Sequence, residues 1–449
     1  MFDKLCRSGT LTRVGYIAAH TLPSFRTLKK YRNLLLAAYS ANRRLPIIRN
    51  NPVVVRLAPA AVCNYRCLFC EVHKDDVLFP NRSQNLMTLE DVKNYESFLS
   101  TAYSVWFYGG SAEPLLSPHF GEIAKYLKSK YNMKLSVNTN GSPLSHALCD
   151  ALVDSGFDYI LLSYHAATRE MYKHLMTGDV ERVDKNIEYL NRRKAEKRAK
   201  KPVVDLSIAL HRMNAQEALP VLDKAKTFHV RAVNVSKYYG GRNKLQDKDV
   251  SFEYDVEAGN KLLDEIYTYG KQQGIRVLPK TPCYWLARPA AMAWNPENYN
   301  RSGECLHPWT RLDFDPVLDE ENCHYVCVCN RISLFKIRYR ECKVDSPERF
   351  DKLWNHPLLQ YMRTTVNGDG LNPMCIFCRN YDLGTLRNLD AAKYAELRDT
   401  AVRSFFEEFR SKYQYEEIRG LEVLRENPYS EESFQQRLTS RKFYKRSSG

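Results

Sequence analysis

The chain has 449 residues, of which 44% are hydrophobic, enough for two or three domains with a large core. The mean hydropathy is −0.49, and no apolar run approaches the length of a membrane span. Arg7, Arg13 and His20 interrupt the N-terminal region, which therefore lacks the apolar stretch of a signal peptide. The 13 cysteines then favour metal ligation and free thiols over a disulfide framework, and we expect a cytoplasmic protein.

The formal net charge of +15 is unevenly distributed along the chain. Residues 1–50 carry ten Lys and Arg but one acid, Asp3, and a second basic run lies at 192–201. Such runs suit phosphates, acidic lipid or nucleic acid, and they equally suit a solvated helix face. We expect residues 1–50 to form a basic helical extension that serves docking and packing rather than chemistry.

In chain order, residues 16–42 predict one or two helices, and a regular alternation of strands and helices begins at residue 53. Thr88 is the expected N-cap of the first helix in this series, and Gly156 ends a later one. Six strands are predicted, at 53–58, 103–110, 133–141, 157–164, 203–211 and 230–241. The helices between and after them are predicted at 88–100, 119–131, 144–156, 168–176, 180–199, 215–229 and 253–274. This alternation predicts an α/β fold, a partial (β/α)6 barrel with parallel strands and right-handed crossovers.

From residue 281 the cysteines crowd together and the secondary-structure signals shorten. A small hairpin is expected around "TRLDFDP" and "CHYVCVC", and a helical stretch at 346–366. The predicted organisation is a basic helical extension, the partial barrel, a small cysteine-rich domain and a charged helical C-terminal extension. Their predicted limits are 1–50, 51–280, 281–382 and 383–449.

The stretch "VCNYRCLFCEVH" places Cys63, Cys67 and Cys70 in a C-x3-C-x2-C pattern directly after the first predicted strand. In a barrel of this kind the reactive end lies where the strands meet the following helices. Three thiolates suit a four-iron cluster that keeps one iron open for a ligand. The alternative is a zinc site completed by His73.

These residues resemble the cluster-binding motif of the radical SAM superfamily, in which an aromatic residue, here Phe69, precedes the third cysteine. "YGGSAEPLL" at 108–116 resembles the family's glycine-rich segment, with two additional residues before Glu113. "VNTNG" at 137–141 and "LLSYHAATREMYKHL" resemble later motifs, although His165 stands where an acid is usual. The resemblance covers about residues 53–380.

The resemblance implies a [4Fe-4S] cluster on Cys63, Cys67 and Cys70 whose open iron binds S-adenosylmethionine. Reductive cleavage of that cofactor gives a 5′-deoxyadenosyl radical that abstracts hydrogen from a substrate, with the protein positioning the groups. An electron donor such as flavodoxin or ferredoxin is implied. The expected contacts to S-adenosylmethionine are Phe69, Gly109, Gly110, Ser111, Glu113, Asn138 and Ser163.

The late cysteines resemble the SPASM or twitch auxiliary-cluster domain of radical SAM proteins, which implies an auxiliary [4Fe-4S] cluster. Its expected ligands are Cys305, either Cys327 or Cys329, Cys375 and Cys378. Because no cysteine follows Cys378, the shorter twitch form with one auxiliary cluster is favoured. A zinc ribbon is the alternative for Cys375 and Cys378.

The substrate is not specified by any motif. A small molecule, sugar-like or phosphate-bearing, is favoured because the region before the first strand is short and helical, unlike a peptide-recognition domain. A peptide is the second choice of substrate. The alternative from another functional class is a zinc-stabilised nucleic-acid-binding protein. For the enzyme favoured here, we do not expect nucleic acid as a partner. His165, Arg212, Tyr238 and Tyr239 follow late strands and are candidate substrate contacts. No catalytic residue is assigned.

Overall fold

The computed structural model describes the chain in ten segments, and the fold is given for these residues. They are 28–70, 86–108, 112–238, 250–252, 255–280, 282, 305–315, 325–327, 337–338 and 346–365.

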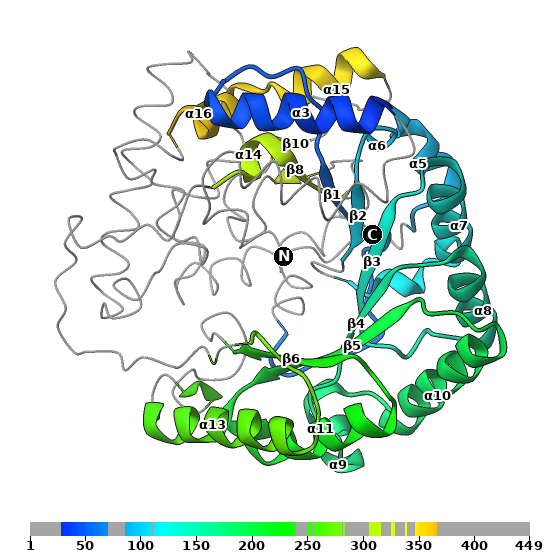
Figure 1. Cartoon of the computed structure of the whole chain (residues 1–449), viewed down its shortest axis with the longest axis vertical. Coiled ribbons are helices and arrows are strands. Elements are labelled where there is room, and N and C mark those ends of the chain that lie inside the picture. The colour runs from blue at the N-terminus through cyan, green and yellow to red at the C-terminus, as the bar shows by residue number, and fades with distance from the viewer. Residues whose placement is uncertain are drawn as a thin grey trace, which may run out of the picture.

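One curved sheet forms the centre of the fold (Figure 1). Its strand order is β10-β9-β8-β1-β2-β3-β4-β5-β6-β7, and the eight strands from β8 to β7 run parallel. The strands are β1 (Val54–Leu57), β2 (Ser104–Phe107), β3 (Lys134–Thr139), β4 (Tyr159–Ser163), β5 (Val203–Leu210), β6 (Ala232–Lys237), β7 (Val277–Leu278), β8 (Arg311–Asp315), β9 (Tyr325–Cys327) and β10 (Ile337–Arg338). Because β7 and β10 lie at opposite margins of the sheet, the barrel is open, as predicted.

Two parallel strands join the six that were predicted, and they come from distant parts of the chain. β7 extends the sheet beyond β6, whereas β8 pairs with β1 although more than 250 residues separate them. β8 and β9 form the predicted hairpin, but β8 is also an integral strand of the barrel. The hairpin therefore joins the late, cysteine-rich region directly to the first strand.

Helices cover the convex side of the sheet, as Figure 1 shows for α7, α8, α10, α11 and α13. The helices are α3 (Leu28–Asn42), α5 (Leu89–Asn94), α6 (Glu96–Leu99), α7 (Phe120–Tyr131), α8 (His146–Ser155), α9 (Arg169–Met176), α10 (Val180–Glu196), α11 (Ala218–Thr227), α13 (Val256–Gln272), α14 (His307–Thr310), α15 (Pro347–Trp354) and α16 (Pro357–Thr365), with 3-10 turns η2 (Pro114–Leu116) and η3 (Arg212–Glu217). In the described residues, none of these helices has the length and apolar character needed to cross a membrane.

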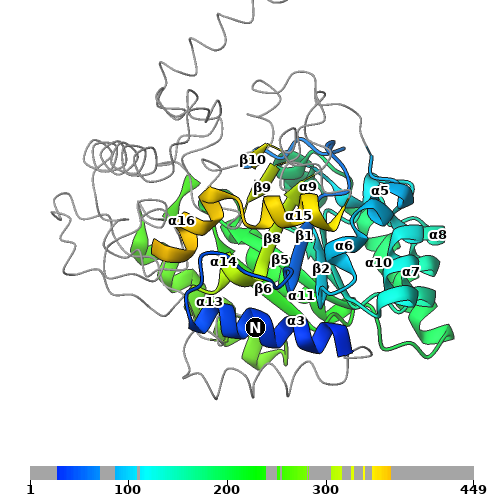
Figure 2. The same ribbon diagram turned by 90° about the horizontal axis from the view of Figure 1, so that it is seen from above.

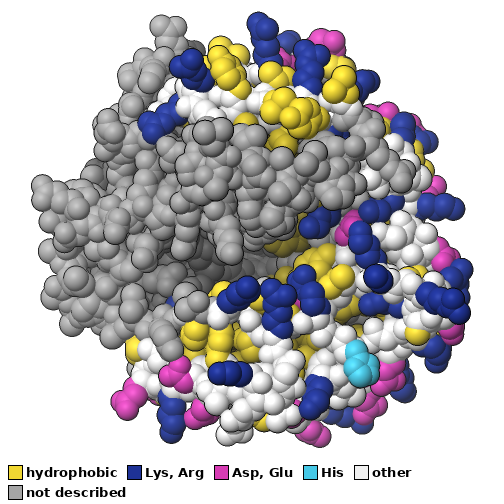
Figure 3. Space-filling model, viewed as in Figure 1, with side chains coloured by type: hydrophobic (Ala, Val, Ile, Leu, Met, Phe, Trp, Pro, Cys, Tyr) yellow, Lys and Arg dark blue, Asp and Glu magenta, His cyan; other side chains and the backbone are white. Residues whose placement is uncertain are grey.

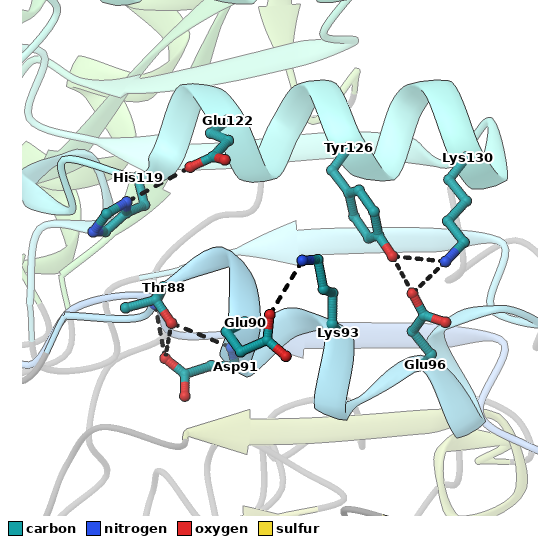
Figure 4. A network of polar contacts seen from close by, with 9 residues as sticks. All are labelled: Thr88, Glu90, Asp91, Lys93, Glu96, His119, Glu122, Tyr126 and Lys130. Carbon is teal, nitrogen blue, oxygen red and sulfur yellow. Dashed lines mark hydrogen bonds and ion pairs between the residues drawn. The ribbon is translucent and has the colours of Figure 1, made fainter.

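Local signals explain where these helices begin and end. Thr88 caps α5 as predicted, because its hydroxyl accepts from the Asp91 backbone N–H while the Asp91 carboxylate accepts from Thr88 (Figure 4). Gly156 ends α8 in a left-handed conformation that suits glycine. The stretch predicted as one helix at 88–100 is divided at Tyr95 into α5 and α6. Beyond the break, Glu96 accepts from Lys130 and Tyr126 of α7, which joins the two elements (Figure 4).

The two faces of the sheet differ in polarity. Leu135 and Val137 of β3 and Leu206 of β5 are fully buried against the helices, and their alternation sets the register of the sheet. The concave face carries polar side chains instead. There the Arg56 guanidinium contacts the Asp313 carboxylate at 3.0 Å, and the Trp106 indole donates to Asn138. The concave face is therefore the one able to receive a polar ligand.

Helix α3 is fixed beneath the amino ends of the first three strands (Figure 2). The Lys30 ammonium donates to the carbonyl of Tyr131, just before β3. The Asn33 amide donates to the carbonyl of Thr101, before β2, and its oxygen accepts from the Asn51 N–H, before β1. The predicted N-terminal helix is confirmed for residues 28–42; residues 1–27 lie outside the described residues.

The late helices close the same end of the barrel. Arg363 of α16 is fully buried and donates to the carbonyls of Pro308, Pro46 and Trp354. The Trp354 indole donates to the carbonyl of Asn50. The helical stretch predicted at 346–366 is thus present as α15 and α16. The predicted extension at 383–449 lies outside the described residues.

Candidate active site

The three early cysteines lie on one loop at the carboxyl end of β1. Cys63, Cys67 and Cys70 are half-buried, and within the described part of the chain they are free thiols. A short turn brings the last two together, because the Cys70 N–H donates to the carbonyl of Cys67. This is the end of a parallel barrel at which reactive groups collect, as the sequence predicts.

The loop is held on one side by the turn that follows β3. The Asn140 amide donates to the Asn64 side chain at 3.0 Å, and Asn64 donates to the Ser142 hydroxyl at 2.7 Å. The Asn140 oxygen in turn accepts from the Ser142 backbone N–H. The "NTNG" segment therefore positions the cysteine loop through Asn140, a role that the sequence analysis did not assign.

On its other side the loop is held by the end of α9. The backbone N–H groups of Arg66 and Leu68 donate to the Thr177 hydroxyl and to the carbonyl of Leu175. Gly178 packs directly against the ring of Tyr65 in this loop. Only glycine fits there, because a Cβ at this position would lie 2.2 Å from that ring. The spacing of the cysteines thus depends on two neighbouring elements rather than on the loop alone.

Burial makes the free thiols poor acids in this loop. It raises the pKa of Cys63 above its usual range. Burial also raises the pKa of Cys67 strongly, and the negative charges of the neighbouring Cys70 and Cys63 thiolates add to that effect. Within the described residues, no three His, Cys, Asp or Glu side chains have the geometry for a single metal ion.

Three thiols on one loop, two of them with pKa values raised by burial, fit an iron–sulfur cluster that requires three thiolates, since bound iron would compensate their negative charge. Cys63, Cys67 and Cys70 would hold that cluster.

Phe69 lies among rings supplied by the segments that follow β4, β5 and β6. Its ring centroid is 4.8 Å from that of His165, 5.2 Å from that of His211 and 6.4 Å from that of Tyr238. These residues follow β4, β5 and β6. The structure therefore brings the predicted residues Phe69, His165 and Tyr238 together, and adds His211 in place of the neighbouring Arg212.

Both histidines in this group are buried. Burial lowers the pKa of His165 to about 3, with a smaller contribution from His211, and burial lowers that of His211 to about 4. The His165 Nδ1 accepts from the Ala209 N–H, so its Nε2 carries the proton of the neutral ring. Among the described residues, neither ring nitrogen of His211 has a hydrogen-bond partner. Strand alternation indicates this inward position, since Leu206, Ile208 and Leu210 face the helices.

Glu113 is fully enclosed and serves as a tie between loops. Its carboxylate accepts from the Asn140 N–H at 2.7 Å, the Thr139 hydroxyl at 2.6 Å and the Leu115 N–H at 3.1 Å. Burial outweighs these hydrogen bonds and raises the pKa of Glu113 to about 7. The Glu113 N–H donates to the carbonyl of Val62, beside the first cysteine. Its described contacts are thus structural, whereas the sequence predicts contact with S-adenosylmethionine.

Of the other predicted cofactor contacts, the structure describes two and leaves three outside the described residues. Asn138 and Ser163 are half-buried at the ends of β3 and β4, and the Asn138 oxygen accepts from Trp106 at 3.1 Å. Gly109, Gly110 and Ser111, and the possible zinc ligand His73, lie outside the described residues. So do Tyr239, Cys329, Cys375 and Cys378. Cys305 is half-buried before α14, and the backbone of Cys327 ends β9. The auxiliary ligand set therefore remains a prediction.

Residues 57–225 match the family model of the radical SAM superfamily. This part of the chain is therefore a radical SAM domain, as the cysteine motif predicts. Members of this family bind a [4Fe-4S] cluster and S-adenosylmethionine, the two cofactors that the cysteine motif implied.

Curated relatives of this chain include GTP 3′,8-cyclases. The probable enzyme of Metallosphaera sedula is 28% identical over 174 residues, which are 38% of this chain and 50% of the relative. The GTP 3′,8-cyclase of Chlorobaculum tepidum is 32% identical over 139 residues, 30% of this chain and 40% of the relative. The chain thus spans about half the length of the curated relatives it matches.

Solved structures share the fold. Streptococcus suis SuiB bound to S-adenosylmethionine has a TM-score of 0.50 and 14% identity, covering 79% of this chain and 74% of SuiB. SuiB bound to its precursor peptide SuiA has a TM-score of 0.51 and 13% identity, covering 79% of this chain and 74% of SuiB. At these identities the similarity concerns the fold alone.

Proposed function

We propose that the protein is a radical SAM enzyme that abstracts hydrogen from a polar small molecule, sugar-like or phosphate-bearing. When bound, the cluster and S-adenosylmethionine supply a reductively generated 5′-deoxyadenosyl radical. The observation that carries the proposal is the loop of Cys63, Cys67 and Cys70 at the carboxyl ends of the parallel strands. An auxiliary cluster on Cys305, Cys327 or Cys329, Cys375 and Cys378 would accept or relay electrons.

The residues of this chain would position the cysteine loop, offer polar contacts and exclude water. Asn140 and Gly178 hold the cysteine loop in position. Asn138 and Ser163 offer polar groups at the mouth of the barrel. The half-buried ring of Phe69 and the buried rings of His165 and His211 exclude water beside them. Because His165 is neutral and its Nδ1 is occupied, its Nε2–H is a hydrogen-bond donor rather than a proton acceptor.

Similarity to GTP 3′,8-cyclases favours a small phosphate-bearing substrate. A peptide is the second candidate, favoured by the fold shared with SuiB, which has been solved with its precursor peptide. These relatives give no support to a zinc-stabilised nucleic-acid-binding protein. The electron donor, flavodoxin or ferredoxin, remains part of the proposal.

The substrate class is tested by formation of 5′-deoxyadenosine in anaerobically reconstituted enzyme. Nucleoside triphosphates, sugar phosphates and short peptides are each added with S-adenosylmethionine and reductant. We expect a phosphate-bearing molecule to stimulate product formation, and its deuterated form to transfer deuterium into 5′-deoxyadenosine. Stimulation and deuterium transfer with peptides alone would assign the protein to peptide modification instead.

A further inference from the structure

An exposed apolar stripe runs along α3. Leu28, Tyr31, Leu35 and Tyr39 are 83, 40, 43 and 56% exposed, and Ile47, just beyond the helix, is 62% exposed. The four helical positions are spaced by three or four residues and therefore share one face. In the described residues these five are the only large apolar side chains that are exposed. In Figure 3 apolar side chains gather on the edge of the molecule occupied by α3, with basic side chains beside them.

The helix packs by its opposite side, which reverses the usual arrangement of a surface helix. The buried positions are small or polar: Lys30, Asn33, Ala37, Ser40 and Ala41. Lys30 and Asn33 attach α3 to the barrel through the carbonyls of Tyr131 and Thr101. The large apolar residues are therefore not needed to hold the helix in place. Contiguous exposed apolar surface of this kind marks an interaction site.

The charges around the stripe indicate its partner. Lys29 and Arg32 are exposed on the same helix, and Arg43, Arg44 and Arg49 are exposed directly after it. No Asp or Glu occurs between residues 4 and 70 of the sequence. A basic helix that also carries Leu and Tyr on its exposed side has the composition of helices that lie in the headgroup layer of anionic membranes.

We propose that the exposed face of α3, with Ile47, docks the protein on an anionic lipid surface. The Leu and Tyr side chains enter the headgroup layer, and the surrounding Lys and Arg contact lipid phosphates. Because α3 lies at the amino ends of β1, β2 and β3, the docked protein presents the cysteine loop at its other end, away from the lipid. This inference is independent of the proposed reaction.

Flotation of the full chain with lipid vesicles tests the proposal. The parent protein should float with vesicles of equal parts phosphatidylglycerol and phosphatidylcholine, but not with phosphatidylcholine alone. Leu35→Ser/Tyr39→Ser should weaken binding at least about tenfold, because two apolar side chains are lost. Lys29→Glu/Arg32→Glu should weaken it by about twenty-fold or more, at about fivefold for each basic residue.

The matched control is Arg182→Glu/Lys185→Glu on α10, which changes the net charge equally at exposed positions. Its binding should stay within about twofold of the parent, because only charges near the lipid contribute strongly. A Leu35→Trp variant gives a direct readout: lipids brominated on their acyl chains should quench the added fluorescence.

Failure of the parent to float with acidic vesicles would overturn the proposal, as would an equal loss in the α10 control. A concentration-dependent dimer that Leu35→Ser/Tyr39→Ser dissociates, in protein that does not float, would instead assign the stripe to a second copy of the chain.

Discussion

The two ends of the parallel sheet are built differently. At the amino end, side chains such as Asn33 and Arg363 donate to backbone carbonyls and tie helices to strands. At the carboxyl end, burial has shifted the pKa values of Cys63, Glu113 and His165 away from their usual ranges. Burial also lowers the pKa of Arg363 at the amino end, so the loop of cysteines beside such groups, rather than displaced pKa values alone, marks the carboxyl end as the functional one. Contacts that hold helices to strands therefore dominate the amino end, whereas the cysteine loop lies at the carboxyl end, and four experiments test this difference.

The largest effect is expected for Cys67→Ala at the carboxyl end. Loss of one of three ligands should abolish formation of 5′-deoxyadenosine from S-adenosylmethionine under dithionite. Cys149→Ala is the control, because this thiol is buried between α8 and the core and donates to the carbonyl of Leu144. The control should keep its iron and its activity. Parent-level product formation by Cys67→Ala would refute the assignment of the cluster.

The second experiment separates the two predicted clusters. Four-iron clusters on the early and late cysteines predict about eight irons per reconstituted chain. Replacing Cys63, Cys67 and Cys70 together should leave about four, with an electron paramagnetic signal that S-adenosylmethionine does not alter. An iron content near zero in a folded triple variant would remove the auxiliary cluster from the proposal while leaving the radical SAM domain intact.

At the amino end, Arg363→Ala should affect stability without affecting iron. Three carbonyls would lose their donor inside the protein, so the free energy of unfolding should fall by about 3 kcal/mol or more. Arg182→Ala, at an exposed position, should change it by less than about 0.5 kcal/mol. Denaturant unfolding and iron analysis measure both outcomes. Loss of cluster in a folded Arg363→Ala protein would mean that the two ends are coupled.

The smallest effect is a pH dependence from Glu113. Burial raises its pKa to about 7, whereas an unfolded glutamate has a pKa of about 4.3. The folded carboxyl therefore retains a proton between these values, and stability should fall as the pH rises through that window, by up to about 4 kcal/mol. Above pH 7 both states are ionised and this contribution is constant.

Glu113→Gln should remove that slope. It should also lower stability by roughly 1–3 kcal/mol at pH 8, because its amide nitrogen would face either the Asn140 or the Leu115 N–H. Urea unfolding of both proteins at pH 5 and pH 8 measures the difference. An identical pH slope in the two proteins would show that another group causes it.

The alternation of inward and outward positions along the strands predicts more residues of the site than the sequence analysis assigned. The buried residues Leu206, Ile208 and Leu210 place Ser207, Ala209 and His211 on the concave face, yet the prediction favoured Arg212. The same alternation in β3 places Asn140 inward, where it holds the cysteine loop through Asn64. These residues were missed because motif resemblance drew attention to Asn138 and to the glycines after β2, although the period of two was already present in the sequence.

The alternation of strands and helices, the cap at Thr88 and the cysteine loop can be read from the amino-acid sequence, because these features depend on residues near one another in the chain. The pairing of β8 with β1 and the contact of Arg56 with Asp313 appear only in the folded protein. So do the enclosure of Glu113 by the loops it joins and the outward direction of the apolar side of α3. Pairings between distant segments, and the direction in which an amphipathic helix faces, depend on which surfaces remain available once the sheet has formed, and no local pattern encodes that choice.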